Sequence, residues 1–516
     1  MTTLAWRTMW RAVAACLAAA PSFAQTAPLR VADSALVGRI LLAEDRRDTT
    51  TSALADGTRH RDPRIRALAL RAEARIRDPK FVSRDSVPGA KTLAPSPSYP
   101  DPAWRLRYRA LTARSDCSAL ERAMRDSAWA VRLRAIDLVS RECARDTSIV
   151  RTLRAWAGSP PQSSQRRAGG VSWHAAAHSM VALAKTSPAD ARTLLPLAIA
   201  SPVPQLRMYG ARAAAALRDT TTLERLSGDA NDNVVEASLD GLSSVAGHAG
   251  DGEYLAALGR SGYQDVRAAA RALVGSTRSG DVVLAALTAA RTLRADSSET
   301  SRDARMAVMD LLAEFATPAN VPDLIQLATD FDCPVAESAA AIARKLHATV
   351  AAKCTPLPIS IPGDAVRLAL GADVRIRVTL ADSSGGGSFV VHLRGDVAPI
   401  MAARVLGLAR SGYYNGLVWH RVEPDFVVQG GGLGANEYRG YPRFFRDELG
   451  TLPHLRGTVG MSTRGHDTGD GQWFFNLREN RRLDRDYTVF ADVVDGIGVV
   501  DGILEGDVIA RMDVLP

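Results

Sequence analysis

A recurring helical pattern over about residues 30–350 limits the fold of this chain more than any other feature. Each copy begins with a turn that contains Asp, Pro or Ser, continues with an apolar residue followed by Arg, and ends in Ala and Leu at helical spacing. The clearest copies start at Asp62, Ser127 and Tyr263. The arginine that follows the apolar residue recurs in most copies after about 27 to 42 residues, which is roughly the spacing of stacked helix pairs. Asp or Ser at the turn caps the next helix, and Ala and Leu let neighbouring pairs share one core.

The pattern resembles the HEAT-repeat family, most specifically in its Asp-x-x-Val-Arg signature. Two departures are the missing arginine in Asn233-Val234-Val235-Glu236 and the two prolines of the turn at 202–204. The resemblance implies an all-α HEAT-like solenoid over residues 25–353, which a Pro/Ser-rich loop at 78–102 interrupts. A generic helical bundle is the alternative.

The helical pattern stops at a proline-rich linker, residues 354–363. Alternating apolar and polar residues follow at 374–380 and 388–394, and this period of two predicts β-strands. Residues 364–516 therefore form a second domain, with one helix expected over about 399–410.

A motif-rich stretch at 412–431 contains Trp419-His420-Arg421 and Phe426-Val427-Val428-Gln429-Gly430-Gly431. It closely resembles the cyclophilin family of peptidyl-prolyl isomerases, and the resemblance continues through 457–462, 472–476, 483–484 and 487–496 with the same order and spacing. It implies an all-β, closed eight-stranded antiparallel barrel with two covering helices.

The same resemblance implies the site residues. The family's catalytic arginine corresponds to Arg421. The residues that correspond to its substrate-binding positions are Phe426, Val427, Gln429, Ser462, Thr463, Gln472, Phe474, Leu483 and Tyr487.

Each residue type suits rotation about an X–Pro bond, which has a barrier of about 18–20 kcal/mol. At the midpoint of rotation the prolyl nitrogen loses amide resonance and regains a lone pair, to which a fixed guanidinium can donate. That hydrogen bond is absent from the planar ground state, so it lowers the barrier. The apolar side chains hold the proline ring. Neither a metal nor a cofactor is required.

Several positions depart from the family pattern. Thr463 stands where Asn or Arg is usual, and Val427 where Met is common. Arg482 stands where cyclosporin-sensitive members of the family have Trp, and Tyr487 stands where animal members have His. The first two departures leave open a non-catalytic scaffold that binds proline-containing peptides.

The first 24 residues have the features of an export signal. Arg7 and Arg11 precede the apolar run 12–20, and Ser22-Phe23-Ala24 provides small residues for cleavage. We expect a bacterial periplasmic or extracellular protein; a buried N-terminal helix and a lipoprotein anchor at Cys16 are alternatives. No later segment reaches the roughly 18 uninterrupted apolar residues of a membrane span.

Four cysteines follow this segment, and in an oxidising compartment they allow three pairings. Sequence proximity favours Cys117 with Cys143 and Cys333 with Cys354. Four free buried thiols are the alternative.

The net charge of +8 is distributed along the chain, because arginines alternate with Asp and Glu. No segment has the concentrated basic stripe of a nucleic-acid-binding protein. His174 and His178 lie one helical turn apart, but alanines separate them, so helix packing is favoured over metal binding.

The sequence therefore predicts an exported isomerase that acts on proline-containing polypeptide clients. Its helical scaffold would bind these clients or an envelope protein. The alternatives are the non-catalytic peptide-binding scaffold and a purely structural assembly protein.

Overall fold

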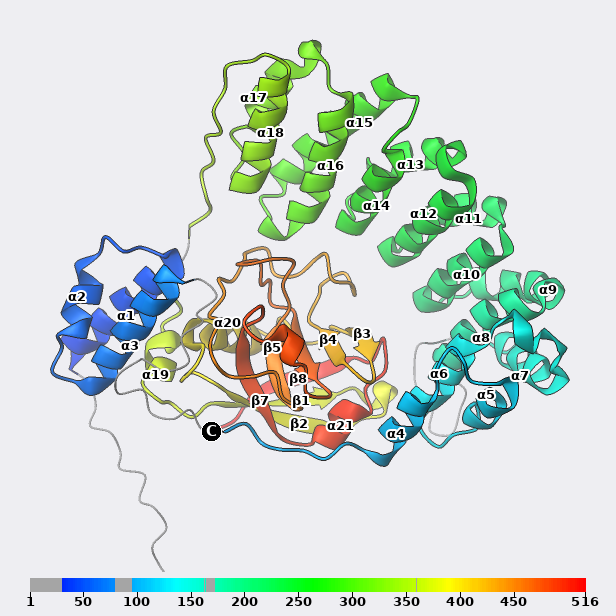
Figure 1. The fold of residues 1–516 in the computed structure, drawn as a ribbon, viewed down its shortest axis with the longest axis horizontal. Coiled ribbons are helices and arrows are strands. Elements are labelled where there is room, and N and C mark those ends of the chain that lie inside the picture. The colour runs from blue at the N-terminus through cyan, green and yellow to red at the C-terminus, as the bar shows by residue number, and fades with distance from the viewer. Residues whose placement is uncertain (1–29, 79–94, 162, 164–171, 359) are drawn as a thin grey trace, which may run out of the picture.

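The computed structural model describes residues 30–78, 95–161, 163, 172–358 and 360–516 (Figure 1). The expected export signal at 1–24 lies outside the described residues, as does most of the Pro/Ser-rich segment 78–102. The helices before the sheet are α1 (Val31–Arg46), α2 (Ser52–Thr58), α3 (Pro63–Arg77), α4 (Ala103–Ala110), α5 (Cys117–Ala123), α6 (Trp129–Leu138), α7 (Thr147–Ala157), α8 (Trp173–Thr186), α9 (Pro188–Ile199), α10 (Pro204–Leu217), α11 (Thr220–Leu226), α12 (Asp232–Ala246), α13 (Asp251–Ala257), α14 (Tyr263–Leu273), α15 (Ser279–Ala295), α16 (Arg302–Phe315), α17 (Val321–Leu327), α18 (Cys333–Lys345) and α19 (Asp364–Ala369).

Acidic side chains cap several of these helices. The Asp62 carboxylate accepts a hydrogen bond from the backbone N–H of Arg64 at 2.8 Å, and Asp116 accepts one from Ala119 at 2.7 Å. Pro63 occupies the first turn of α3, where a helix has no internal partner for an N–H. These contacts explain why the helices begin at the turn residues of the sequence pattern.

Helices α4–α18 form a curved array around one side of the sheet (Figure 1). The inner row, nearer the sheet, contains α8, α10, α12, α14, α16 and α18, which pack on one another in succession. A single hydrophobic core rich in Ala and Leu runs through the array from Leu111 to Ala343. The helical character of the region is as predicted, and its assignment to HEAT repeats stays a prediction.

The C-terminal region forms one antiparallel sheet with the strand order β3-β4-β6-β5-β7-β2-β1-β8. Its strands are β1 (Arg375–Leu380), β2 (Ser388–Leu393), β3 (Trp419–Glu423), β4 (Val427–Gly430), β5 (Thr458–Met461), β6 (Trp473–Asn476), β7 (Val489–Asp495) and β8 (Ile509–Val514). Helices α20 (Pro399–Arg410) and α21 (Ile497–Asp501) accompany the sheet. The eight strands agree with the expected number.

The sheet curls so that its two edges approach each other. The backbone N–H of Trp419 donates to the carbonyl of Asp507 at 2.9 Å, and that of Ile509 donates to Leu417 at 2.8 Å. The rings of Trp419, Trp473 and Phe475 are buried in the core of this domain. Complete closure into a barrel stays a prediction.

The first three helices pack on the sheet domain, although the sequence pattern groups them with the rest of residues 25–353. Ile40 of α1 and Ile65 of α3 belong to the same hydrophobic core as Phe389 of the sheet. The described segment 95–102 then connects this side of the molecule to α4 (Figure 1). Along it, the Tyr99 hydroxyl donates to the carbonyl of Val493 at 2.8 Å.

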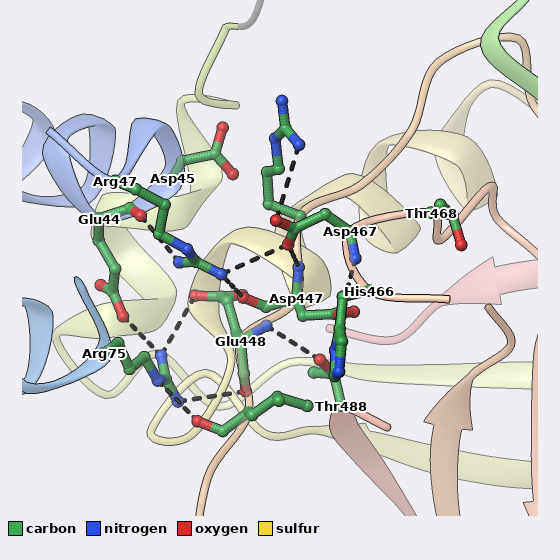
Figure 2. Close-up of polar contacts among 12 residues, drawn as sticks. Glu44, Asp45, Arg47, Arg75, Asp447, Glu448, His466, Asp467, Thr468 and Thr488 are labelled. Carbon is green, nitrogen blue, oxygen red and sulfur yellow. Dashed lines mark hydrogen bonds and ion pairs between the residues drawn. The ribbon is translucent and has the colours of Figure 1, made fainter. Parts of the chain in front are cut away.

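Arg75 of α3 links these helices to the sheet domain (Figure 2). Its buried guanidinium donates to Glu44 of α1 at 2.6 Å and to the carbonyl of Val397 at 2.7 Å. Burial alone would raise the pKa of Glu44, but Arg71 and Arg75 lower it to about 2. Glu448 lies 3.7 Å from Arg75, and burial raises the pKa of this second carboxyl to about 7.

Two disulfides join the cysteine pairs that are nearest in sequence. Cys117 bonds to Cys143, and Cys333 bonds to Cys354. The second bond ties the beginning of α18 to the segment that follows the array. Within the described part of the chain, no helix is both long and apolar enough to cross a membrane.

Candidate active site

Three of the predicted site residues form a row across neighbouring strands. Arg421 on β3 lies opposite Gln429 on β4, and Gln429 lies opposite Phe474 on β6. Directly opposite residues point to the same face of a sheet and lie within side-chain contact distance. The register therefore brings these three side chains together.

A bulge in β3 directs Arg421 to the outer face. The pairing of β3 with β4 shifts between Trp419 and Arg421. Without the shift, strand alternation would put these two residues, two positions apart, on the same face. With it, Trp419 packs in the core while the Arg421 side chain remains 44% exposed.

Beside this row lies a cluster of apolar side chains that is separate from the main core. Val427, Phe474 and Leu483 are buried in it, and Phe426 and Tyr487 pack against them partly buried. Any side chain at Gly460 on β5 would overlap the Phe474 ring. Glycine therefore allows the ring to lie flat against the strand. We call these five side chains the apolar pocket.

His454 supports the pocket from inside the domain. Its ring stacks on Phe474 with centroids 5.9 Å apart, and its edge contacts Tyr487 at 6.5 Å. Asp484, the neighbour of Leu483, lies 3.2 Å from its Nδ1. Burial lowers the pKa of His454 although Asp484 opposes the shift, which favours the neutral ring. No motif in the sequence marks this histidine.

Charged side chains lie at the rim of the pocket. The Nε of Arg421 donates to the Glu423 carboxylate on the same strand at 2.9 Å. The guanidinium of Arg482 lies 4.3 Å from the centre of the Phe426 ring, a cation–π contact. Arg421 therefore stands in a defined ion pair, and Arg482 covers one edge of the pocket.

Buried amides complete the site. Gln429 is 3% exposed, and its Nε2 has no hydrogen-bond partner among the described residues. Gln472 is also buried, and its Nε2 donates to the carbonyl of Glu437 at 3.0 Å. Ser462 donates its backbone N–H to the carbonyl of Gln472 at 2.9 Å, which places the partly buried Thr463 at the end of β5. An unpaired amide beside Arg421 is available to a ligand carbonyl.

Comparisons with known proteins agree with this geometry. The family model described as cyclophilin type peptidyl-prolyl cis-trans isomerase/CLD matches residues 376–514. Peptidyl-prolyl cis-trans isomerase-like 1 of Homo sapiens is 37% identical over 124 residues, which are 23% of this chain and 74% of the human protein. The chain belongs to the cyclophilin family.

Three more proteins are similar to part of this chain. A peptidyl-prolyl cis-trans isomerase of Helicobacter pylori is 35% identical over 132 residues, 24% of this chain and 78% of that protein. Peptidyl-prolyl cis-trans isomerase-like 2 of Gibberella zeae is 35% identical over 119 residues, 22% of this chain, and the match spans only 21% of the fungal protein. A solved cyclophilin-type isomerase of Cryptosporidium parvum aligns with 28% of this chain and 99% of its own, at 21% identity and a TM-score of 0.26.

The histidine next to the candidate catalytic arginine of the cyclophilin domain is not a proton carrier at neutral pH. Burial and the neighbouring charge of Arg421 lower the pKa of His420 to about 4. The ring is therefore uncharged at pH 7. Bond rotation transfers no proton, so a neutral histidine is compatible with isomerase chemistry.

His174 and His178 of the helical array each contact a different residue. His174 Nε2 lies 2.7 Å from the carbonyl oxygen of Glu505, and His178 Nδ1 lies 2.6 Å from Asp137. Among the described residues, no group of three or more His, Cys, Asp or Glu side chains is arranged to hold a metal ion.

Proposed function

We propose that this chain is a peptidyl-prolyl cis-trans isomerase that rotates X–Pro bonds in folding or exported polypeptides. The observation that carries the proposal is the position of Arg421, in one cross-strand row with Gln429 and beside the apolar pocket. The row supplies donors for a polypeptide backbone, and the cluster supplies an apolar surface against which a proline ring can pack. These are the two requirements for holding a prolyl residue during rotation.

The first step is to bind the proline ring. Phe426, Phe474 and Leu483 present an apolar surface that is already assembled, with Phe474 fixed between His454 and Gly460. A fixed ring holds one side of the X–Pro bond still while the other side turns. Removing the bond from water also disfavours the polar resonance form that makes it stiff.

The second step is to stabilise the rotated bond. At half rotation the prolyl nitrogen carries a localised lone pair, and a guanidinium N–H of Arg421 can donate to it. Glu423 engages the Nε side of this guanidinium, which leaves further N–H groups free to donate. The interaction exists only in the transition state, so it accelerates the reaction instead of only tightening binding.

The donor and the apolar side chains can together supply the barrier reduction that catalysis requires. Uncatalysed isomerisation takes tens to hundreds of seconds, and a millisecond time constant needs a barrier lower by about 5–6 kcal/mol. A preorganised donor supplies about 3–4 kcal/mol. Fixation and desolvation of the ring must supply the remainder.

We assign the helical array a scaffold role. In this proposal it is a HEAT-like solenoid that holds a client polypeptide or an envelope protein near a closed cyclophilin barrel, which raises the local concentration of proline segments. The support is the arrangement in Figure 1, in which the inner row of helices faces the domain that carries Arg421. A pull-down with permanently unfolded clients tests it; the full chain would retain these clients, and no retention would contradict the scaffold role.

We also propose that the chain is exported. The two disulfides support an oxidising compartment, and the leader-like pattern of residues 1–24 supports secretion. Expression of the full chain in a bacterial host, followed by fractionation and N-terminal sequencing, tests this; a periplasmic product that begins at Gln25 is expected. A product retained in the cytoplasm with Met1 in place would contradict it.

The isomerase proposal is tested with a short Ala-Pro peptide, by measuring cis-trans exchange with the full chain and with Arg421→Ala. We expect the variant to lose about 10²–10³-fold in kcat/KM. Arg511→Ala is a matched control, because Arg511 forms the same kind of ion pair with the residue two positions on, Asp513, on β8. Peptide binding without exchange by the full chain would instead identify a non-catalytic proline-binding scaffold.

A further inference from the structure

A cleft of about 810 Å³ separates the inner row of the helical array from the cyclophilin domain. Helices α10 and α12 form one wall. Val418, His420 and Arg421 of the cyclophilin domain line the other. The volume is within the range of pockets that bind ligands in proteins. We call this space the interdomain cleft.

Contacts between the two domains join the walls of the cleft. Asn233 of α12 donates to the carbonyl of Gly434 at 3.1 Å and accepts from Asn436 at 3.2 Å. The Tyr209 hydroxyl of α10 donates to the Glu505 carboxylate at 3.2 Å. The walls therefore keep a fixed separation without filling the space between them.

The interdomain cleft is continuous with the candidate active site. Arg421 lines the cleft and also stands in the row beside the apolar pocket. Gln472 makes a second connection, because its Nε2 donates to the carbonyl of Glu437 on the cleft wall. Its Oε1 is buried and has no partner within the described part of the chain. A polypeptide with its proline in the pocket would pass these two residues and enter the cleft.

Acidic side chains are more numerous than arginines in the lining of the cleft. Four acidic side chains and two arginines line it. Glu236 and Asp240 lie one turn apart on α12, and among the described residues neither makes a hydrogen bond or ion pair. Burial raises the pKa of Asp240, although the charges of Arg271, Arg267 and Arg212 oppose this. Burial and the nearby Asp240 raise the pKa of Glu236 to about 7, although Arg267 and Arg212 oppose this. A cation between the two carboxylates would remove an unfavourable interaction.

We propose that the interdomain cleft binds the polypeptide segment that flanks the proline, and that Glu236 and Asp240 select segments with lysine or arginine. The proposal rests on the isomerase function proposed above and adds a substrate class to it. The cyclophilin domain would recognise the proline, and the helical array would read its neighbours. Charge complementarity of this kind sets specificity more than it sets overall affinity.

Three peptides with the same Ala-Pro core test the proposal, extended at both ends by lysines, by glutamates or by glutamines. Exchange is followed by NMR, because a coupled protease would respond to the flanking charges itself. Binding to the full chain is measured in parallel by calorimetry. At low ionic strength we expect about tenfold higher kcat/KM and affinity for the lysine peptide than for the glutamate peptide, a ratio that shrinks in high salt.

The double variant Glu236→Gln/Asp240→Asn removes both charges at nearly constant size, and we expect the lysine-to-glutamate ratio to fall at least threefold. Asp240→Asn alone changes an exposed side chain, so it remains informative if the double variant folds poorly. Glu224→Gln on α11 is the matched control, because this exposed carboxylate does not line the cleft. A ratio near one in the full chain, or a ratio that survives the double variant, would overturn the proposal.

The two readouts separate this inference from the isomerase function. Exchange of all three peptides at equal rates would overturn the role of the cleft and leave the isomerase intact. Preferential binding of the lysine peptide without exchange of any peptide would overturn the isomerase function and leave the role of the cleft intact. Loss of that preference in the double variant would then assign the cleft to a binding protein.

Discussion

Gln429 on β4 lies directly opposite Arg421 on β3, and the Nε2 of this buried glutamine has no hydrogen-bond partner among the described residues. A buried donor without a partner costs about 1–3 kcal/mol of stability. Such a cost next to the candidate catalytic arginine indicates a group that is paired only when substrate is bound.

Gln429→Leu tests this relationship. We expect the free energy of unfolding to rise by about 1 kcal/mol, because the unpaired amide is removed, and kcat/KM to fall about tenfold, the equivalent of one hydrogen bond. Thermal denaturation and NMR exchange of an Ala-Pro peptide measure the two effects. Gln326→Leu on the exposed face of α17 is the control. A variant with lower stability and unchanged kcat/KM would show that Gln429 has only a structural role.

Arg75→Met should separate helices α1–α3 from the cyclophilin domain. The Arg75 side chain is 3% exposed, and its removal deprives Glu44 and three carbonyl groups of a charged donor. Breaking a buried ion pair in this way costs about 3–5 kcal/mol. Urea denaturation followed by tryptophan fluorescence measures the loss.

Arg77→Met is the matched control for Arg75. Arg77 lies one half-turn further along α3 and is 78% exposed, and its one ion-pair partner within the described residues is Glu73. An exposed ion pair of this kind contributes about 0.3–0.5 kcal/mol. Equal effects of the two substitutions would mean that α1–α3 do not depend on this contact for docking.

Parts of the fold follow from local patterns in the sequence. Asp62 and Asp116 cap helices because a short acceptor before an apolar helical run satisfies free amides wherever it occurs. The cross-strand row of Arg421, Gln429 and Phe474 follows from the family resemblance together with strand pairing. These features depend on near neighbours in the chain or on a motif shared with relatives.

Other features depend on distant contacts that no local pattern encodes. Helices α1–α3 have the same Ala and Leu spacing as the array, so their docking on the cyclophilin domain through Arg75 was not predictable. His454 lies in a loop and is defined as part of the site by its contacts with the rings of Phe474 and Tyr487. The interdomain cleft arises only when α12 and β3, far apart in the sequence, are placed together.

The disulfide between Cys333 and Cys354 should stabilise the end of the helical array. It closes a segment with a sequence separation of 21 residues, for which loop-closure entropy gives about 3 kcal/mol. We expect Cys333→Ala/Cys354→Ala to unfold at lower denaturant concentration by an amount equivalent to this loss. Exchange of a short Ala-Pro peptide should be unaffected, because the apolar pocket lies in the other domain. If reductant leaves the denaturation curve of the parent chain unchanged, the bond does not form in solution.

Glu448→Gln should change how stability depends on pH. In the folded chain burial raises the pKa of Glu448 from 4.5 to about 7. Between pH 4.5 and pH 7 the folded state therefore binds more protons than the unfolded state. Its contribution to the free energy of unfolding is therefore full below pH 4.5 and is lost as pH rises to about 7. The variant lacks this loss of stability, so we expect its free energy of unfolding to increase by about 3 kcal/mol relative to the parent between pH 4.5 and pH 7. Glu44→Gln is the opposite control, because its pKa is lowered and its contribution is full above pH 4.5. The free energy of unfolding is measured by urea denaturation from pH 4 to 8. If it changed with pH in the same way for Glu448→Gln and the parent chain, the raised pKa of Glu448 would be contradicted.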